Sequence, residues 1–285
     1  MPSLIDIRRR VRSVRNMQQI TKAMKMVSAA KLRRAQDRAL AARPYATILR
    51  QMLANVAEAA SQSPEGAHPL LTVRPEERIL LVVVTADSGL AGGFNSNLLK
   101  LAQRFVDEHK SKDLRFELIG RKGRDYFRRR NANILGEHID VFRNIRYEDA
   151  EKIADSIIER FSAAEIDAVY LFVNEFKSVM TPNLSMTRML PIEVPKSQTT
   201  ADYIYEQTPD ELLGSLLPKY VKGQIYRALL ESFAAYQAAR MTAMDAATSN
   251  ASDMIDDLTL YMNRVRQASI TREIIEIVSG AAALE

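Results

Sequence analysis

The sequence contains no cysteine, no tryptophan and only three histidines among its 285 residues. Without cysteine the chain forms no disulfide, holds no metal through thiolates and offers no thiol nucleophile. His68, His109 and His138 do not stand at metal-ligand spacings from one another, so we expect no metal site. No residue pattern typical of catalysis occurs either, and we expect no cofactor.

Long apolar runs are also missing. No stretch of 18 apolar residues occurs, so we expect no helix that spans a membrane. The segment from Met1 to Arg10 is charged almost at once and lacks the apolar core of a signal peptide. We therefore expect a chain that stays in the cytosol.

Residues that break helices are scarce at both ends. Between Gly223 and Gly280 stand 56 residues with neither glycine nor proline, enough for a helix of about 84 Å. Nothing between Pro2 and Pro44 breaks a helix, and we expect Pro44 to interrupt or bend the N-terminal one. Pro209 to Pro218 is expected to form a short helix start.

Apolar residues at both ends recur at steps of three and four, in narrow stripes that are typical of coiled-coil seams. The predicted N-terminal seam contains Ile7, Val11, Val14, Met17, Ile20, Met24 and Val27. The predicted C-terminal seam contains Leu229, Phe233, Tyr236, Met244, Ala247, Ala251, Met254, Leu258, Met262, Val265 and Ala268. Two such stripes can bury each other, so we expect an antiparallel coiled coil.

The middle of the chain has a different character. Residues 78–85 form a continuous apolar run rich in β-branched residues, as in a strand buried on both faces. Further strands are expected at 114–119, 132–135, 168–176 and, at an edge, 184–190, with helices at 95–110, 122–130 and 147–164. This alternation predicts a Rossmann-like, mostly parallel α/β sheet domain inserted between the two long helices. The expected domains are 1–60, 76–195 and 209–285.

Charge is unevenly distributed. Residues 1–50 hold thirteen Lys and Arg against two acids, a net charge of +11, so the remainder carries −6. A basic helix of this kind is either a solvated face or a surface for an acidic partner, such as nucleic acid, an anionic membrane or an acidic protein loop.

Two polar features invite a chemical interpretation. The glycine-rich loop from Ser88 to Asn95 matches neither a dinucleotide fingerprint nor a P-loop, so a tight turn is favoured over a phosphate site. Asp87 is expected to cap that turn. The acidic cluster of Asp253, Asp256 and Asp257 lacks further ligands at suitable spacing, so a solvated or partner-facing patch is favoured over a metal site.

We expect the C-terminal helix end to be apolar nearly all round, since it contains Ile274, Ile275, Ile277, Val278, Ala281, Ala282, Ala283 and Leu284. The alternatives are burial within the chain's own domain and cover by a surrounding partner. We favour the partner, because the end of a coiled coil has no domain of its own to bury it.

Several motifs carry a family resemblance. Residues 266–283 contain Ile-Thr-x-Glu-x-x-Glu followed, after three residues, by Gly-Ala. Gln19 to Lys31 and Arg43-Pro44-Tyr45 belong to the same pattern, and residues 87–93 correspond to Asp-Arg-Gly-Leu-Cys-Gly-Gly, with Ser88 and Ala91 as departures. Together these motifs resemble the gamma subunit of bacterial F-type ATP synthases over the whole chain.

The resemblance implies a central rotor that couples proton-driven rotation of a membrane ring to ATP synthesis, that regulates ATPase activity and proton flow, and that performs no catalysis itself. The implied partners are the alpha, beta and epsilon subunits and the membrane c-subunit ring, on the cytoplasmic face of the bacterial inner membrane. Nucleic acid is not among them. The implied contacts with alpha and beta are Lys22, Met24, Lys25, Arg266, Gln267, Thr271, Glu273 and Glu276, and those with the membrane ring are Tyr203, Tyr205 and Glu206.

Two rival interpretations remain from the residues alone. A basic coiled-coil protein that binds nucleic acid would explain the N-terminal charge but not the C-terminal motif. A Rossmann-like nucleotide enzyme would require phosphate-binding glycines and an acidic ribose ligand, which we do not find.

Overall fold

The computed structural model describes residues 3–60, 68–176, 182–193 and 207–282. The chain packs as two compact units. One consists of residues 1–28 and 240–285, and the other of residues 29–239. The expected segments 1–60, 76–195 and 209–285 follow the secondary structure, whereas packing divides each long helix between the two units.

Two long helices occupy the ends of the chain, as predicted. Helix α1 spans Leu4–Ala60 and helix α5 spans Pro209–Ala282. Helix α5 begins at Pro209, as expected, and continues through Pro218. Pro44 lies inside α1, so the helix is not interrupted there. A proline removes one helical hydrogen bond. Burial of Leu49 and Leu53, which follow Pro44, keeps that part of α1 packed on the core despite this loss.

The 29–239 unit contains a five-stranded sheet in the order β3-β2-β1-β4-β5. The strands are β1 (Arg78–Val84), β2 (Asp113–Ile119), β3 (Asn133–His138), β4 (Ala168–Phe176) and β5 (Pro182–Leu190). The first four strands are parallel, and β5 pairs antiparallel with β4 at the edge. The predicted Rossmann-like sheet with an edge strand is confirmed.

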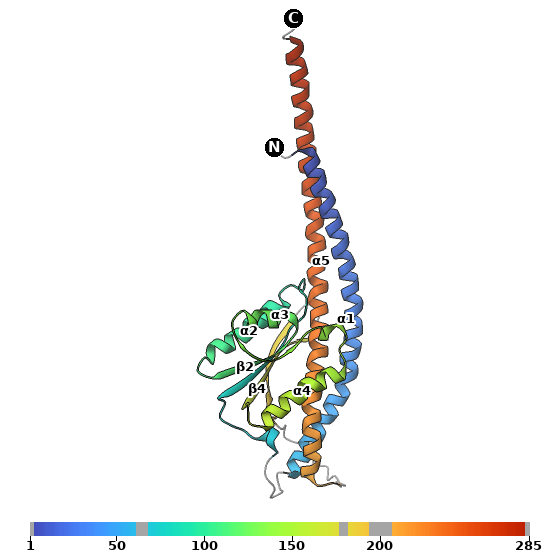
Figure 1. Ribbon diagram of the computed structural model, residues 1–285. Coiled ribbons are helices and arrows are strands. Elements are labelled where there is room, and N and C mark those ends of the chain that lie inside the picture. The colour runs from blue at the N-terminus through green and yellow to red at the C-terminus, as the bar shows by residue number, and fades with distance from the viewer. Residues whose placement is uncertain (1–2, 61–67, 177–181, 194–206, 283–285) are drawn as a thin grey trace. The chain divides into compact units, whose positions relative to one another are not determined.

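Helices cover both faces of this sheet (Figure 1). They are α2 (Phe94–Glu108), α3 (Arg121–Arg128) and α4 (Tyr147–Ser162), with short 3-10 turns η1 (Pro69–Leu71) and η2 (Val141–Arg143). Ile79, Leu81 and Val83 of β1 pack in one buried cluster with α2 and α3. The intervening Leu80, Val82 and Val84 pack in a second cluster with α4 and with parts of α1 and α5. Because both faces of β1 are covered, its sequence is apolar from Ile79 to Val84.

The other unit pairs the first part of α1 with the last part of α5 (Figure 1). The Oγ1 atoms of Thr21 and Thr248 lie 2.8 Å apart, and the Lys25 Nζ lies 2.6 Å from an Asp245 carboxylate oxygen. As residue numbers rise along α1, the numbers of the contacting residues on α5 fall, so the two helices run antiparallel. The predicted antiparallel coiled coil is confirmed.

The seam of α1 differs from the predicted one. Positions at alternating steps of three and four are all buried or half-buried, namely Leu4, Ile7, Val11, Val14, Gln18, Thr21, Lys25, Ser28, Leu32, Ala35, Ala39, Ala42, Ala46, Leu49, Leu53 and Val56. Such a repeat of 3.5 residues is the mark of a left-handed coiled coil. Four of these positions are polar.

Met17, Ile20 and Val27, which we expect in the seam, are instead 54–56% exposed. Each of them stands one residue before a polar seam position. A seam predicted from apolar residues alone is therefore displaced by one residue toward the N-terminus in this part of α1. On α5, Met254 and Ala268 are likewise exposed, and Ile255 takes the half-buried position beside Met254. The uninterrupted heptad repeat, rather than the nearest apolar residue, determines which side chains are buried.

Candidate partner-binding surfaces

No helix among the described residues lies beside the last part of α5. Since Thr21 lies against Thr248, the antiparallel register places Leu4 opposite residue 265. Helix α5 continues to Ala282, and Figure 1 shows it extending past the start of α1. From Ile270 to Gly280 every side chain is exposed. We call residues 266–282 the free end of α5.

The free end carries an apolar stripe. Ile270, Ile274, Ile277 and Val278 stand at i, i+4, i+7 and i+8, which places them on one face of a helix, and they are 49–72% exposed. Over residues 270–278 the apolar surface is therefore one-sided, and Ile275 lies beside it. A contiguous exposed stripe of this size marks a surface that another molecule covers.

The predicted contact residues Arg266, Gln267, Thr271, Glu273 and Glu276 all lie exposed on this free end. The Thr271 hydroxyl donates to the Gln267 carbonyl oxygen at 2.9 Å. The carboxylates of Glu273 and Glu276 are exposed, so a partner can reach them without opening the fold.

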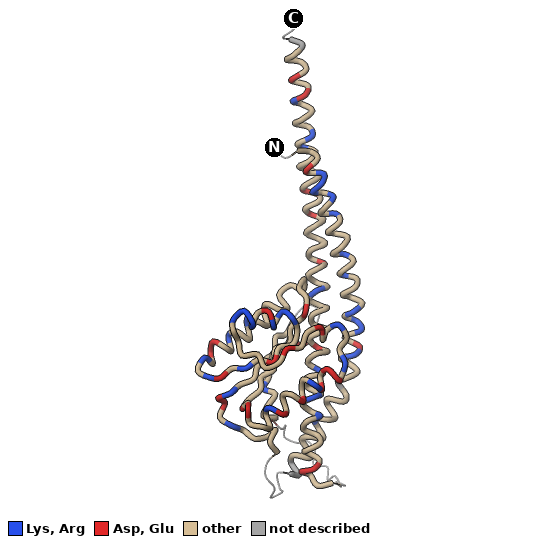
Figure 2. The backbone as a smooth tube through the Cα atoms, viewed as in Figure 1, with Lys and Arg blue, Asp and Glu red and all other residues tan. Residues whose placement is uncertain are grey.

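On α1, the predicted contacts Lys22, Met24 and Lys25 have different surroundings. Lys25 is half-buried and forms the ion pair with Asp245 inside the chain, whereas Lys22 is exposed. Among the described residues Lys22 forms no ion pair. Figure 2 shows Lys and Arg gathered along this part of α1. Lys22 is therefore the cation available to a partner, and Lys25 chiefly joins α1 to α5.

Met17, Ile20, Met24 and Val27 form what we call the α1 ridge. They recur at steps of three and four, and Met24 is half-buried while the other three are exposed. Sequence reasoning missed this ridge because it assigned the same residues to the seam. Counting heptads from Leu4 through Val56 would have separated the ridge from the seam.

The predicted contacts Tyr203, Tyr205 and Glu206 lie outside the described residues, and they stay a prediction.

The glycine-rich loop after β1 acts as a structural turn. The Phe94 amide donates to the Ala91 carbonyl oxygen, and the Asn97 amide donates to that of Gly93. The Asn95 side chain accepts from the Ala86 amide at 2.9 Å. Since these amides are engaged within the loop and the helix that follows, the turn interpretation fits better than a phosphate site.

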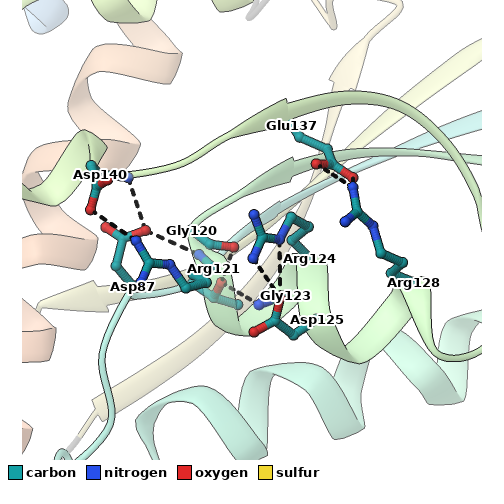
Figure 3. A network of polar contacts seen from close by, with 10 residues as sticks. Asp87, Gly120, Arg121, Gly123, Arg124, Asp125, Arg128, Glu137 and Asp140 are labelled. Atoms are coloured by element: carbon teal, nitrogen blue, oxygen red, sulfur yellow. Dashed lines mark hydrogen bonds and ion pairs between the residues drawn. The ribbon is translucent and has the colours of Figure 1, made fainter.

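Asp87 has a different role from the expected one. Its Oδ1 accepts from the Arg121 amide at 3.1 Å and from the Asp140 amide at 2.9 Å (Figure 3). Arg121 is the first residue of α3, so Asp87 caps α3 rather than its own turn. It ties together the segments that follow β1, β2 and β3.

Ion pairs lie along α3 and join it to β3. Arg124 pairs with Asp125 at 2.8 Å and Arg128 with Glu137 at 2.9 Å (Figure 3). The hydrogen bond from Arg124 holds the pKa of Asp125 below its usual value. The cluster orders the ends of the strands, and among the described residues it contains no nucleophile paired with a base.

A buried polar cluster joins β2, β3 and α4. Glu117 is 1% exposed, and its carboxylate lies 2.6 Å from His138 Nε2 and accepts from Arg160 Nη1 at 3.1 Å. A buried carboxylate with two such partners is satisfied by its own fold. Sequence reasoning missed it, because the three residues are far apart in the chain.

Across the described ranges, no group of three or more His, Cys, Asp or Glu side chains is arranged to hold a metal ion. Over the same ranges, no helix is both long and apolar enough to cross a membrane.

A Rossmann-like sheet unit combined with an antiparallel helix pair defines the architectural class, and comparisons with known proteins identify the family. The ATP synthase family profile matches residues 3–284. The ATP synthase gamma chain of Solibacter usitatus is 63% identical over 286 residues, and that of Pelotomaculum thermopropionicum is 50% identical over 288 residues. Each alignment covers 100% of both chains. The chain belongs to the ATP synthase gamma-chain family.

Solved structures agree with this assignment. A chain in the central stalk and c-ring structure of the Tetrahymena thermophila mitochondrial ATP synthase is 26% identical, with a TM-score of 0.64 over 80% of this chain and 99% of that one. A chain of the Euglena gracilis mitochondrial ATP synthase has a TM-score of 0.69 at 16% identity, over 99% of this chain and 94% of that one. At that identity the second match shows the fold alone.

Proposed function

We propose that this chain is the central-stalk rotor subunit of a bacterial F-type ATP synthase. In this role it couples rotation of a membrane ring to conformational change and ATP synthesis in a ring of alpha and beta subunits. It performs no catalysis itself. Full-length similarity to ATP synthase gamma chains supports the proposal, as does the likeness to a chain from a central stalk.

The free end of α5 is the observation that carries the proposal. A helix whose Ile274, Ile277 and Val278 are more than half exposed needs a host that surrounds it. Apolar contacts are non-directional, so a helix held by them can turn in a sleeve without breaking a fixed hydrogen bond at each step.

Coupling then follows from differential contacts. A rotor that presents different residues to each catalytic subunit stabilises a different conformation in each, which is a coupling free energy between rotor angle and nucleotide affinity. The driving energy is about 2.3 kcal/mol per elementary charge moved across 100 mV.

The α1 ridge and Lys22 would face the beta subunits close to acidic loops. Lys25 is already paired with Asp245 inside the chain. A positive charge added at Met24, on the α1 ridge, would therefore change the contact with the beta subunits most. Tyr203, Tyr205 and Glu206 would contact the membrane ring. The epsilon subunit would bind the sheet unit, and the whole would lie peripherally on the cytoplasmic face of the inner membrane. Control of ATPase activity and proton flow would follow from the same contacts.

The experiment compares Met24→Lys with Met26→Lys in the assembled complex. Residue 26 lies about 200° around α1 from residue 24 and is 62% exposed, so it adds the same charge on the opposite face. The quantities measured are ATP hydrolysis and ATP-driven proton pumping in membrane vesicles. We expect Met24→Lys to keep hydrolysis and to lower the pumping per ATP, and Met26→Lys to leave both unchanged.

A normal pumping ratio in Met24→Lys would contradict the proposed contact. Purification of the chain from its source tests the assembly itself. We expect it to come out with three copies each of two larger subunits. A chain that comes out alone and binds nucleotide or DNA would instead support one of the rival functions.

A further inference from the structure

A cleft of about 690 Å3 lies within the 29–239 unit, between the middle of α1, the first part of α5 and the start of α4. Its walls carry four tyrosine rings and two guanidinium groups, from Tyr45, Tyr147, Tyr220, Tyr226, Arg50 and Arg227. A volume of this size suits a small organic molecule, and aromatic walls with a few polar groups are typical of such sites. The proposed rotor role does not use it.

The aromatic walls are held in place. The rings of Tyr147 and Tyr226 meet edge to face, with centroids 5.5 Å apart and an interplanar angle of 73°. Arg38 donates to the Tyr226 hydroxyl at 3.5 Å and to the Ile145 carbonyl oxygen at 2.7 Å. Burial, and next the nearby Tyr45 phenol, raise the pKa of Tyr147. The phenol therefore stays neutral near pH 7 and can donate a hydrogen bond.

The charge of the lining is positive. The described residues that line the cleft include no Asp or Glu. Arg227 pairs with Glu231 at 2.8 Å, which partly neutralises it. Arg50 is exposed and forms no ion pair with any residue that the structure describes. Arg50 is thus the cation that an anionic ligand would meet.

Gly223 keeps the cleft open. A Cβ atom built on Gly223 meets only the Leu49 Cδ2 atom, at 3.9 Å, so the space above this glycine is unfilled. A glycine inside a helix is less stabilising than an alanine. A larger side chain at residue 223 would project into the cleft.

We propose that this cleft binds a planar aromatic anion, with its ring between the tyrosine walls and its carboxylate or sulfonate at Arg50. A flat ring matches the tyrosine faces and edges. The guanidinium group supplies charge-assisted hydrogen bonds to the anion.

The first test titrates the full-length chain with 8-anilinonaphthalene-1-sulfonate and with its uncharged analogue N-phenyl-1-naphthylamine. Gly223→Leu places a bulky side chain in the cleft, and Gly223→Ala is its matched control. We expect Gly223→Leu to weaken binding of the sulfonate at least tenfold and Gly223→Ala to keep it within about twofold. Binding elsewhere, for example to the free end of α5, is common to all variants. Equal affinity in the two glycine variants would overturn the proposal.

The second test reverses the charge. Arg50→Glu reverses the charge of the cleft arginine that has no ion pair among the described residues, and Arg34→Glu changes an exposed arginine of α1 outside the cleft. We expect Arg50→Glu to weaken the sulfonate at least tenfold while it leaves the uncharged analogue unchanged, and Arg34→Glu to affect neither. Because Arg50 is exposed, this variant folds even if Gly223→Leu does not. Identical behaviour of the two arginine variants would refute the role of Arg50.

The third test uses the assembled complex and the photoreactive acid 4-benzoylbenzoate. We expect 4-benzoylbenzoate to label peptides with residues 42–50 or 220–227 in the assembled complex, and the sulfonate to reduce this labelling. That result supports a ligand site in the working protein. Label there on the isolated chain alone means that a neighbouring subunit covers the cleft, which would overturn the proposed site. Neither outcome depends on the rotor function.

Discussion

Asp167 joins the start of β1 to the start of β4, and its replacement by asparagine tests how the sheet unit is held together. The Asp167 carboxylate accepts from the Arg78 side chain at 2.7 and 3.1 Å and from the Arg78 amide at 2.9 Å. The side chain of Asp167 is only 4% exposed, whereas that of Arg78 is 40% exposed. Asp167→Asn keeps the shape and removes the charge.

The expected loss in the free energy of unfolding is about 2 kcal/mol. Removal of one partner of a fully buried ion pair costs about 3–5 kcal/mol. The cost is smaller here, because the exposed Arg78 guanidinium regains water when the pair is lost. Asp113→Asn is the control, since Asp113 pairs with Arg115 at 2.8 Å at the same edge of the sheet but is 44% exposed. We expect it to cost less than about 1 kcal/mol.

The pH dependence gives a second readout. The hydrogen bond from the Arg78 side chain, and further that from its amide, hold the pKa of Asp167 below its usual value. An aspartate in the unfolded chain has a pKa of about 3.9. Its contribution to stability is therefore complete above about pH 5 and is lost as pH falls through the lower pKa of the folded state. The difference between wild type and Asp167→Asn should stay constant from pH 5 to 8 and shrink below pH 4.

The assay is urea unfolding followed by tyrosine fluorescence. The chain lacks tryptophan, and nine of its ten tyrosines lie within residues 29–239, so the signal reports on the sheet unit. Equal losses in the free energy of unfolding of Asp167→Asn and Asp113→Asn would refute the reasoning. So would a difference between wild type and Asp167→Asn that is the same at pH 7 and pH 3.

Three further outcomes are expected. Glu117→Gln should lower the free energy of unfolding by about 1–3 kcal/mol in urea, because it weakens a buried network, whereas the more exposed Glu137→Gln should cost under about 1 kcal/mol. Equal losses in Glu117→Gln and Glu137→Gln would show that burial of the carboxylate does not decide the loss of stability. A double-mutant cycle of Thr21→Val and Thr248→Val, followed by circular dichroism at 222 nm, should give a coupling energy of about 0.5–1.5 kcal/mol, and additive effects would show that their contact contributes nothing. Gly120→Ala should lower the melting temperature strongly, since φ is +91° there and a Cβ would overlap the Thr85 carbonyl oxygen, and an unchanged melting curve would contradict this geometry.

Most of the fold could be predicted from local patterns. The apolar run that became β1, the alternation of strands and helices, and the absence of helix breakers near both ends each depend on neighbours in the sequence. These features set backbone conformation through steric preference and hydrogen-bond geometry, which act over a few residues. The candidate contact residues of the free end follow from a family resemblance. Arg266, Gln267, Thr271, Glu273 and Glu276 are exposed, and their contacts stay a prediction.

Other features could not be predicted from local patterns. The α1 ridge was assigned to the seam, because a stripe of Met17, Ile20 and Val27 is more apolar than the seam itself. Asp87 reaches the amides of Arg121 and Asp140, which lie 34 and 53 residues away. No local pattern records such partners.

The sequence by itself determined that the chain has a long helix at each end, a mostly parallel sheet between them in the sequence, and an apolar, unbroken C-terminal helix end, because these follow from composition and periodicity. Only the tertiary structure decided which stripe is buried, which lysine is paired, and that four tyrosines from three helices surround an open cleft. The physical reason is that burial and ion pairing are properties of neighbours in space, and the tertiary fold brings those neighbours together from distant parts of the chain.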